Sequence, residues 1–341
     1  MPKRLGLFLS VALACTALVG CGDSASFATG SSASTSFLAM DASAPSLLVM
    51  PDMGVSPILS AIQGAQKSIQ LTMYMFTDYD TTGQLVQALI ARAQAGVDVR
   101  VLIDPHPYVG PSHSDPSAAA VQALEQGGVK VEDSSPDFRY THEKAMVIDG
   151  KTAYIMTCNF TNAAFSSNRE YAVVDHDPTD VAEVSNIFRA DWNRQDYTPS
   201  DPNLVVSPTN SHQQLLDLID SARHSIVVQC EVIGDQRIAD ALGARAQDGV
   251  DIKVMLSRLG SKTDDRESQQ LADEGITQVE FNRHIKMHAK AIVVDGQRAY
   301  IGSENLSTNS LDHNRELGLI TQDRSLVSHL MSVQNEDWNN D

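Results

Sequence analysis

The feature that most constrains this chain is an internal repeat, because segments of its first half return in its second half in the same order. Residues 88–102 (ALIARAQAGVDVRVL) return as residues 241–255 (ALGARAQDGVDIKVM). Further along, residues 144–150 (KAMVIDG) return as residues 290–296 (KAIVVDG). The offset between the copies shrinks along the chain, which places short insertions or deletions in loops and leaves the folded elements in register.

Each copy alternates strand-like and helix-like segments. Runs rich in β-branched residues predict buried strands at residues 69–76, 99–103, 226–233 and 252–256, and the segments 85–94 and 238–247 between them have helical character. Gly96 and Gly249 follow these helices where a glycine commonly ends one. The strand-helix-strand order predicts parallel pairing through right-handed crossovers, and the Asp-Gly pairs at Asp149 and Asp295 predict hairpin turns.

The repeat therefore predicts an α/β fold of two repeated units related by a pseudo-twofold axis, with mixed sheets flanked by helices. We expect the first unit at residues 46–196 and the second at residues 197–341, joined through a stretch rich in Pro, Asn, Asp and Ser. Ahead of them, we expect a signal peptide at residues 1–20. Residues 21–45, rich in Ser, Ala and Thr, are expected to form a flexible tether.

The start of the chain has the pattern of an export signal. Two basic residues precede an apolar run that is too short and wrongly flanked for a membrane-spanning helix. The run ends in Leu-Val-Gly-Cys21, which resembles the lipobox of bacterial lipoproteins. That resemblance implies cleavage before Cys21, lipidation of its sulfur, and anchoring in the cell envelope, with Gly22 indicating the outer membrane. A secretory signal with a chance cysteine is the alternative.

Two further cysteines, Cys158 and Cys230, lie in strand-like apolar runs. An export route permits a disulfide between them, and burial as two small apolar side chains is the alternative. The sequence leaves the pairing open, because a disulfide requires a geometry that spacing alone does not supply.

The formal net charge is −18 at pH 7, from 25 Lys and Arg against 43 Asp and Glu. Binding to nucleic acid without sequence preference depends on Lys and Arg that neutralise phosphates. The charge therefore weighs against a nucleic-acid partner, although it leaves room for a small basic pocket. We expect a monomer.

Both copies carry the pattern His-x-Lys-x4-Asp, at His142, Lys144 and Asp149 and again at His288, Lys290 and Asp295. Residues two apart in a strand share a face, so each imidazole is expected beside an ammonium. An imidazole can act as a nucleophile or a general acid near neutral pH, and an ammonium can hold a phosphoryl oxygen. Two such pairs facing one cleft would suit an in-line displacement at phosphorus through a covalent phosphohistidine.

The paired pattern resembles the HKD motifs of the phospholipase D superfamily, and the resemblance covers nearly all of residues 48–341. In that family a Gly-Ser-x-Asn stretch follows the Asp, and residues 302–305 (GSEN) match it. The first copy reads MTCN at residues 156–159, with Met156 where the family has glycine. A carboxylate follows in the family as well, matched here by Glu170 and Glu316.

The resemblance implies that His142 is the nucleophile and that His288 is the general acid and later the base. Glu170 and Glu316 would each accept an N–H from an imidazole and so fix its tautomer. Four donors would hold the non-bridging oxygens, namely Lys144, Lys290, Asn159 and Asn305. The Asp-Gly context of the two motif aspartates favours a turn role over direct chemistry.

Four further residues are expected to contact the substrate. Thr157 and Ser303 come from the stretches that follow the motifs, and Arg283 and Lys286 would form a positive mouth that attracts a phosphate head group. A solvated basic loop is the alternative for the last two. We expect no cofactor and no metal, because the donors already neutralise a monoanionic diester.

A phospholipid is the expected substrate, because a lipid anchor would hold the site beside a bilayer. We expect hydrolysis of the head group, with phosphatidyl transfer of the cardiolipin-synthase type as the alternative. Family synthases usually carry N-terminal membrane helices, and no such apolar stretch follows the export signal. The acidic charge weighs against a nuclease, and the retention of both His-Lys pairs weighs against a scaffold with a degenerate site.

Overall fold

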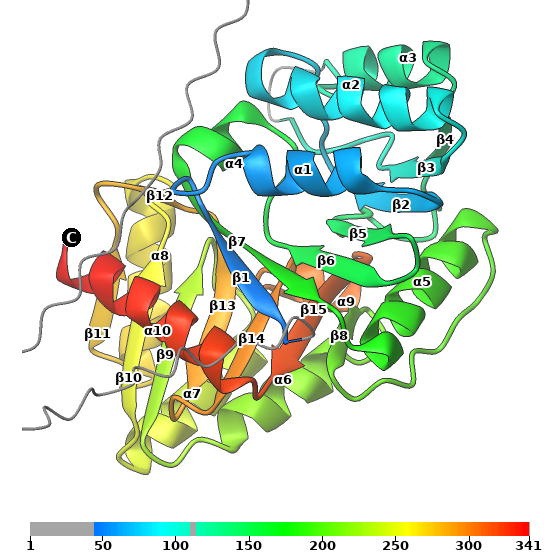
Figure 1. The fold of residues 1–341 in the computed structure, drawn as a ribbon. Coiled ribbons are helices and arrows are strands. Elements are labelled where there is room, and N and C mark those ends of the chain that lie inside the picture. The colour runs from blue at the N-terminus through cyan, green and yellow to red at the C-terminus, as the bar shows by residue number, and fades with distance from the viewer. Residues whose placement is uncertain (1–43, 110–113, 341) are drawn as a thin grey trace, which may run out of the picture. The chain divides into compact units, whose positions relative to one another are not determined.

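The computed structural model describes residues 44–109 and 114–340, which form two β-sheets with helices packed against them (Figure 1). The predicted signal peptide, Cys21 and nearly all of the predicted tether lie outside these residues. None of the helices within the described ranges has both the length and the apolar character needed to cross a membrane.

The first sheet uses residues 46–175. Its strands are β1 (Ser46–Met50), β2 (Ser68–Met73), β3 (Asp98–Ile103), β4 (Lys130–Asp133), β5 (Ala145–Ile148), β6 (Thr152–Met156) and β7 (Asn168–Asp175). Their order in space is β1-β7-β6-β5-β2-β3-β4, in which β2, β3 and β4 are parallel and the other neighbours antiparallel. The accompanying helices are α1 (Ser56–Gly64), α2 (Asp80–Gln94), α3 (Ala118–Gln126), α4 (Asn162–Ser166) and α5 (Pro178–Trp192).

The second sheet repeats this connectivity. Its strands are β8 (Leu204–Ser207), β9 (Ser225–Cys230), β10 (Asp251–Leu256), β11 (Gln278–Phe281), β13 (Lys290–Val294), β14 (Arg298–Gly302) and β15 (Glu316–Thr321). They lie in the order β11-β10-β9-β13-β14-β15-β8. The helices are α6 (Ser211–Asp220), α7 (Gln236–Gln247), α8 (Ser261–Asp273), α9 (Thr308–Asp312) and α10 (Arg324–Asn339). The predicted fold class, two mixed sheets flanked by helices, is confirmed.

The predicted strands and helices occur in both copies with small shifts at their ends. Gly96 and Gly249 end α2 and α7 with φ of +89° and +86°, a backbone conformation that glycine adopts without strain. The stretch expected to join the units contains a strand, because β8 lies within it and pairs with β15. Its polar residues therefore surround a short buried strand.

Three apolar clusters hold the layers together. One lies between the first sheet and helices α1 to α4, and its equivalent lies between the second sheet and helices α6, α7, α8 and α9. The third lies between the two sheets and includes Val147 of β5 and Val293 of β13. Their neighbours Ile148 and Val294 point to the outer clusters, because successive side chains in a strand alternate between faces. Strands buried on both faces explain why these segments read as continuous apolar runs.

The two cysteines left open by the sequence are free thiols. Cys158 lies in the outer cluster of the first sheet, and Cys230 lies in the outer cluster of the second. Both behave as small buried apolar side chains.

The segment that leads into each motif pairs with a strand of the other sheet. Strand β12 (Lys286–Met287) runs parallel to the start of β7, with Met287 opposite Arg169. The equivalent bridge in the other direction joins Thr141 to Arg315 at the start of β15. Each motif histidine therefore lies next to the start of a strand of the opposite sheet.

Two buried arginines reinforce this crossing. The guanidinium of Arg169 donates to both carboxylate oxygens of Asp337 on α10, at 2.9 and 2.7 Å. Arg315 donates at 2.7 Å to Asp191 on α5. Each ion pair therefore joins a strand of one copy to the last helix of the other copy.

The motif aspartates lie at the predicted hairpins, where Asp149 and Asp295 have φ of +56° and +53°. The carboxylate of Asp149 accepts hydrogen bonds from the backbone N–H groups of residues 66–68, at 2.6 to 3.0 Å. Asp295 accepts the equivalent bonds from residues 223–225, at 2.7 to 2.9 Å. Partial burial works to raise the pKa of each carboxyl, but these donors hold it below its ordinary value. Each aspartate ties its hairpin to the start of the central parallel strand.

We predict that Asp149→Ala and Asp295→Ala each lower the free energy of unfolding by about 1–2 kcal/mol, because three backbone donors lose a charged acceptor. Asp149→Asn should lose less, since asparagine also tolerates positive φ in turns. Urea denaturation followed by circular dichroism measures both effects. Wild-type stability in both alanine variants would contradict this role.

Candidate active site

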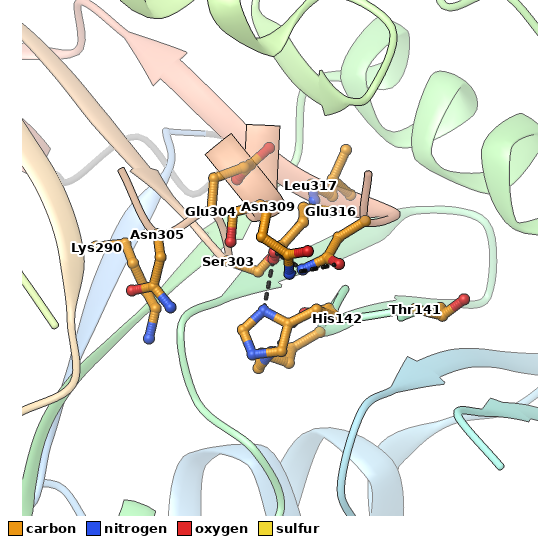
Figure 2. A network of polar contacts seen from close by, with 12 residues as sticks. Thr141, His142, Lys290, Ser303, Glu304, Asn305, Asn309, Glu316 and Leu317 are labelled. Carbon is orange, nitrogen blue, oxygen red and sulfur yellow. Dashed lines mark hydrogen bonds and ion pairs between the residues drawn. The ribbon is translucent and has the colours of Figure 1, made fainter. Parts of the chain in front are cut away.

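Each motif histidine faces a buried glutamate of the other copy. The Nδ1 atom of His142 lies 2.7 Å from Oε2 of Glu316, the first residue of β15 (Figure 2). The Nδ1 atom of His288 lies 2.7 Å from Oε1 of Glu170 in β7. The sequence spacing did not show which glutamate serves which histidine, and the structure pairs them crosswise.

This pairing sets the state of His142. Because a carboxylate faces Nδ1, the proton belongs on that nitrogen and Nε2 keeps its lone pair. Burial lowers the pKa of His142 to about 4, although the Glu316 carboxylate works to raise it. The ring is therefore neutral at pH 7. Burial would raise the pKa of Glu316, but the contact with His142 holds it below its ordinary value.

The motif lysines are completely buried beneath the histidines. Each ammonium donates to the carbonyl of its own motif histidine, Lys144 to His142 and Lys290 to His288. Burial lowers the pKa of Lys144 to about 7, against the opposing effect of Glu316. The expected placement of each His-Lys pair on one strand is not found in either copy, because β5 begins only after Lys144 and β13 begins only after His288.

Both histidines open onto one cavity of about 420 Å³. Its lining includes His142, Asn159, Glu170, Glu231, Lys286 and His288. A larger hollow of about 570 Å³ lies around His176 and contains none of the motif residues. The two motif histidines therefore share the smaller space with Asn159 and Glu170, whereas the two motif lysines are not among its lining residues.

The other predicted residues lie at different depths. Asn159 and Lys286 line the cavity, and Asn305 lies beside Lys290 (Figure 2), with its amide nitrogen 3.4 Å from Oε2 of Glu231. Arg283 is exposed and does not belong to the cavity lining. Asp149 and Asp295 accept backbone hydrogen bonds at their hairpins and are not part of the cavity lining.

Thr157 and Ser303 are fully buried and lie outside the cavity lining. The Thr157 hydroxyl donates to Oε2 of Glu170 at 2.6 Å and accepts the backbone N–H of Tyr171 at 2.9 Å. The Ser303 hydroxyl accepts the equivalent N–H of Leu317 at 3.0 Å. In this arrangement the two hydroxyls position the strands that carry the glutamates.

The difference between Met156 and Gly302 is a matter of packing. A Cβ at Gly302 would come within 2.5 Å of the Cα of Gly318 on the neighbouring strand. Met156 occupies the equivalent place in the first sheet and is buried in its outer cluster. The glycine therefore permits a close approach of two strands.

Among the cavity residues outside the predicted set, Tyr74 and Glu231 carry side chains that contact the motif residues. They hold equivalent places in the repeat, directly after β2 and β9. The Tyr74 ring packs edge-on against His142 with 4.5 Å between ring centroids, and the Lys144 Nζ lies 5.1 Å from its centroid. The sequence could have pointed to Glu231, because the repeat has a carboxylate there and the aromatic Tyr74 at the equivalent position.

Away from the motifs, the described residues contain one cluster with metal-ligand chemistry, formed by His212, Asp235 and Asp312. Sequence spacing did not reveal it, because its members are distant along the chain. Arg237 already forms ion pairs with both carboxylates, at 2.9 and 2.7 Å. The protein itself therefore supplies a cation to both carboxylates of the cluster.

Both copies of the repeat match one known family of proteins. A family model described as "Cardiolipin synthase, PLD-like domain" matches residues 58–192 and again residues 215–338. A cardiolipin synthase of Alkalihalophilus pseudofirmus is 26% identical over 319 residues, covering 81% of this chain and 62% of that protein. Cardiolipin synthase B of Escherichia coli K12 is 28% identical over 315 residues, covering 78% of this chain and 73% of the relative.

Among solved structures, phosphatidylserine synthase of Haemophilus influenzae superposes with a TM-score of 0.67 at 14% identity and covers 85% of each chain. At that identity the likeness concerns the fold. The match to the Alkalihalophilus synthase spans less than two thirds of that protein's length. The family model, however, covers most of this chain in two successive matches. The chain belongs to the phospholipase D superfamily, in the family of cardiolipin synthase-type PLD-like domains.

Proposed function

We propose that this protein is a phosphatidyl transferase that moves a phosphatidyl group from one phospholipid to a hydroxyl of another through a phosphohistidine. The observation that carries the proposal is the pair of motif histidines on one cavity, each with Nδ1 against a glutamate of the opposite copy. The sequence alone favoured hydrolysis. The relatives, which are named cardiolipin synthases, support the transfer alternative better.

In the first step, Nε2 of His142 attacks phosphorus, a P–N bond forms, and the bond to the leaving alcohol breaks. His288 donates its proton to the departing oxygen. In the second step, His288 takes the proton of the acceptor hydroxyl while that oxygen attacks phosphorus and releases His142. Donors around the cavity hold the non-bridging oxygens as charge develops on them.

The two histidines differ in a way that supports these roles. His142 is neutral near pH 7, which leaves Nε2 free to attack. His288 has a carboxylate facing each ring nitrogen, Glu170 at Nδ1 and Glu231 3.3 Å from Nε2. Such an arrangement suits a ring that delivers a proton and takes it back.

Hydrolysis by water differs from transfer only in the acceptor, so the product decides between them. With phosphatidylglycerol vesicles in EDTA, we expect cardiolipin and glycerol. Phosphatidic acid as the sole lipid product would indicate that the protein is a hydrolase. Cleavage of DNA in preference to lipid would indicate a nuclease.

We predict that His142→Ala and His288→Ala each abolish this activity, because each removes a reacting group. His329→Ala provides the matched control, since His329 is exposed on α10 far along the chain from either motif. Lipid products are measured by thin-layer chromatography, and thermal melting verifies the fold. Near-normal turnover in either motif variant would refute the paired-histidine mechanism.

We predict a bell-shaped dependence of kcat/KM on pH. Activity should rise above about pH 4, where His142 loses its proton, and fall above about pH 7, where Lys144 loses the charge that holds a phosphoryl oxygen. Lys144→Arg, if active, should lose the alkaline decline, because a guanidinium stays protonated. A wild-type profile that is flat through neutral and alkaline pH would contradict the assignment.

We also propose that lipidation of Cys21 holds the protein at a membrane of the cell envelope, which the lipobox-like sequence supports. Cys21→Ser should move the protein from the membrane fraction to the soluble fraction and abolish incorporation of labelled palmitate. Unchanged fractionation and labelling would argue against the anchor.

A further inference from the structure

The residue that follows β9, Glu231, contacts two further groups besides the Nε2 atom of His288 named above. Its Oε2 atom lies 3.3 Å from Nζ of Lys290, 3.3 Å from Nε2 of His288 and 3.4 Å from the amide nitrogen of Asn305. One carboxylate oxygen thus lies within 3.4 Å of nitrogen atoms of the lysine, the histidine and the asparagine of the second motif region.

These three groups are donors that the proposed reaction directs at the substrate. Lys290 and Asn305 would hold a non-bridging phosphoryl oxygen, and Nε2 of His288 would face the leaving oxygen. The Glu231 oxygen therefore lies where an oxygen of the phosphoryl group would have to lie. A carboxylate and a phosphodiester anion cannot share this position, because two like charges repel strongly in a site shielded from water.

The first copy has no counterpart of this carboxylate. Tyr74 holds the equivalent position, and its ring lies against His142 and Lys144. Burial would raise the pKa of Glu231, but His288 and Lys290 hold it far below its ordinary value. The second half of the site therefore contains the negatively charged carboxylate of Glu231. The first half has the aromatic ring of Tyr74 at the equivalent position.

We infer that Glu231 is a specificity-determining residue, a resident anion that occupies the phosphoryl-oxygen position of the second motif and must be displaced by the substrate. The inference rests on the proposed function, since it concerns the same phosphate site. Lys286 lines the same cavity, and its charge also acts on Glu231, so it offers the displaced carboxylate a partner.

Displacement makes phosphoryl contacts alone a poor source of affinity. When a free phosphate ion or a small phosphomonoester binds, only its phosphoryl contacts offset the free energy lost when the Glu231 ion pairs break. A phosphodiester carrying acyl chains adds binding energy from apolar surface. Glu231 therefore makes the site select lipid-borne diesters over small soluble phosphates.

The test is the binding of inorganic phosphate to the purified protein, measured by isothermal titration calorimetry and by the phosphate-induced shift in melting temperature. In Glu231→Gln, whose side chain is nearly isosteric and uncharged, we expect the affinity for phosphate to rise about tenfold or more, the scale of a lost charge-assisted contact. Glu280→Gln is the matched control, because it removes the same charge from an exposed position on β11 and should leave phosphate binding unchanged.

If Glu231→Gln fails to fold, Glu231→Tyr copies the residue of the first half-site and carries the same expectation. Equal phosphate affinity in wild type and the folded Glu231 variant overturns the inference, as does the absence of phosphate binding in both. The measurement requires no turnover. Tighter phosphate binding in a protein that transfers no phosphatidyl group would sustain the role of Glu231 and refute the proposed function.

Discussion

The site depends on one constraint, the pairing of each motif segment with a strand of the opposite sheet. Met287 lies opposite Arg169, and Thr141 lies opposite Arg315. Because successive residues of a strand point to opposite faces, fixing Arg169 on the Asp337 side leaves Glu170 on the side of His288. The pairing of β12 with β7 thus aligns both the Arg169–Asp337 ion pair and the Glu170–His288 contact.

The charged groups brought together in this way are almost fully removed from water. Lys144, Lys290, Glu170 and Glu316 are all completely buried. Burying charges is costly unless they are paired or hydrogen-bonded. Here each lysine donates to the carbonyl of its own motif histidine, and each glutamate faces the Nδ1 atom of a histidine. The same desolvation depresses the pKa of His142 and of Lys144, so the arrangement that demands pairing also tunes the reacting groups.

The repeat was sufficient to predict the two sheets, the helices between their strands and the Asp-Gly hairpins, because periodicity and turn residues act locally. The repeat could not predict that each glutamate contacts the histidine of the other copy, because Glu170 and Glu316 are equally far along the chain from their own motifs. Glu231 was missed because its partners meet it only in the folded chain. The buried roles of Thr157 and Ser303 likewise depend on neighbouring strands that spacing does not reveal.

The crossed ion pairs of Arg169 and Arg315 have a consequence for how the protein comes apart. When one copy unfolds, the buried arginine of the other loses its ion pair with Asp337 or Asp191. The apolar cluster between the sheets also loses the side chains of one sheet. Unfolding one copy therefore loses the contacts between the sheets in addition to that copy's own contacts. Although the sequence consists of two copies, we expect the body to unfold as one cooperative unit.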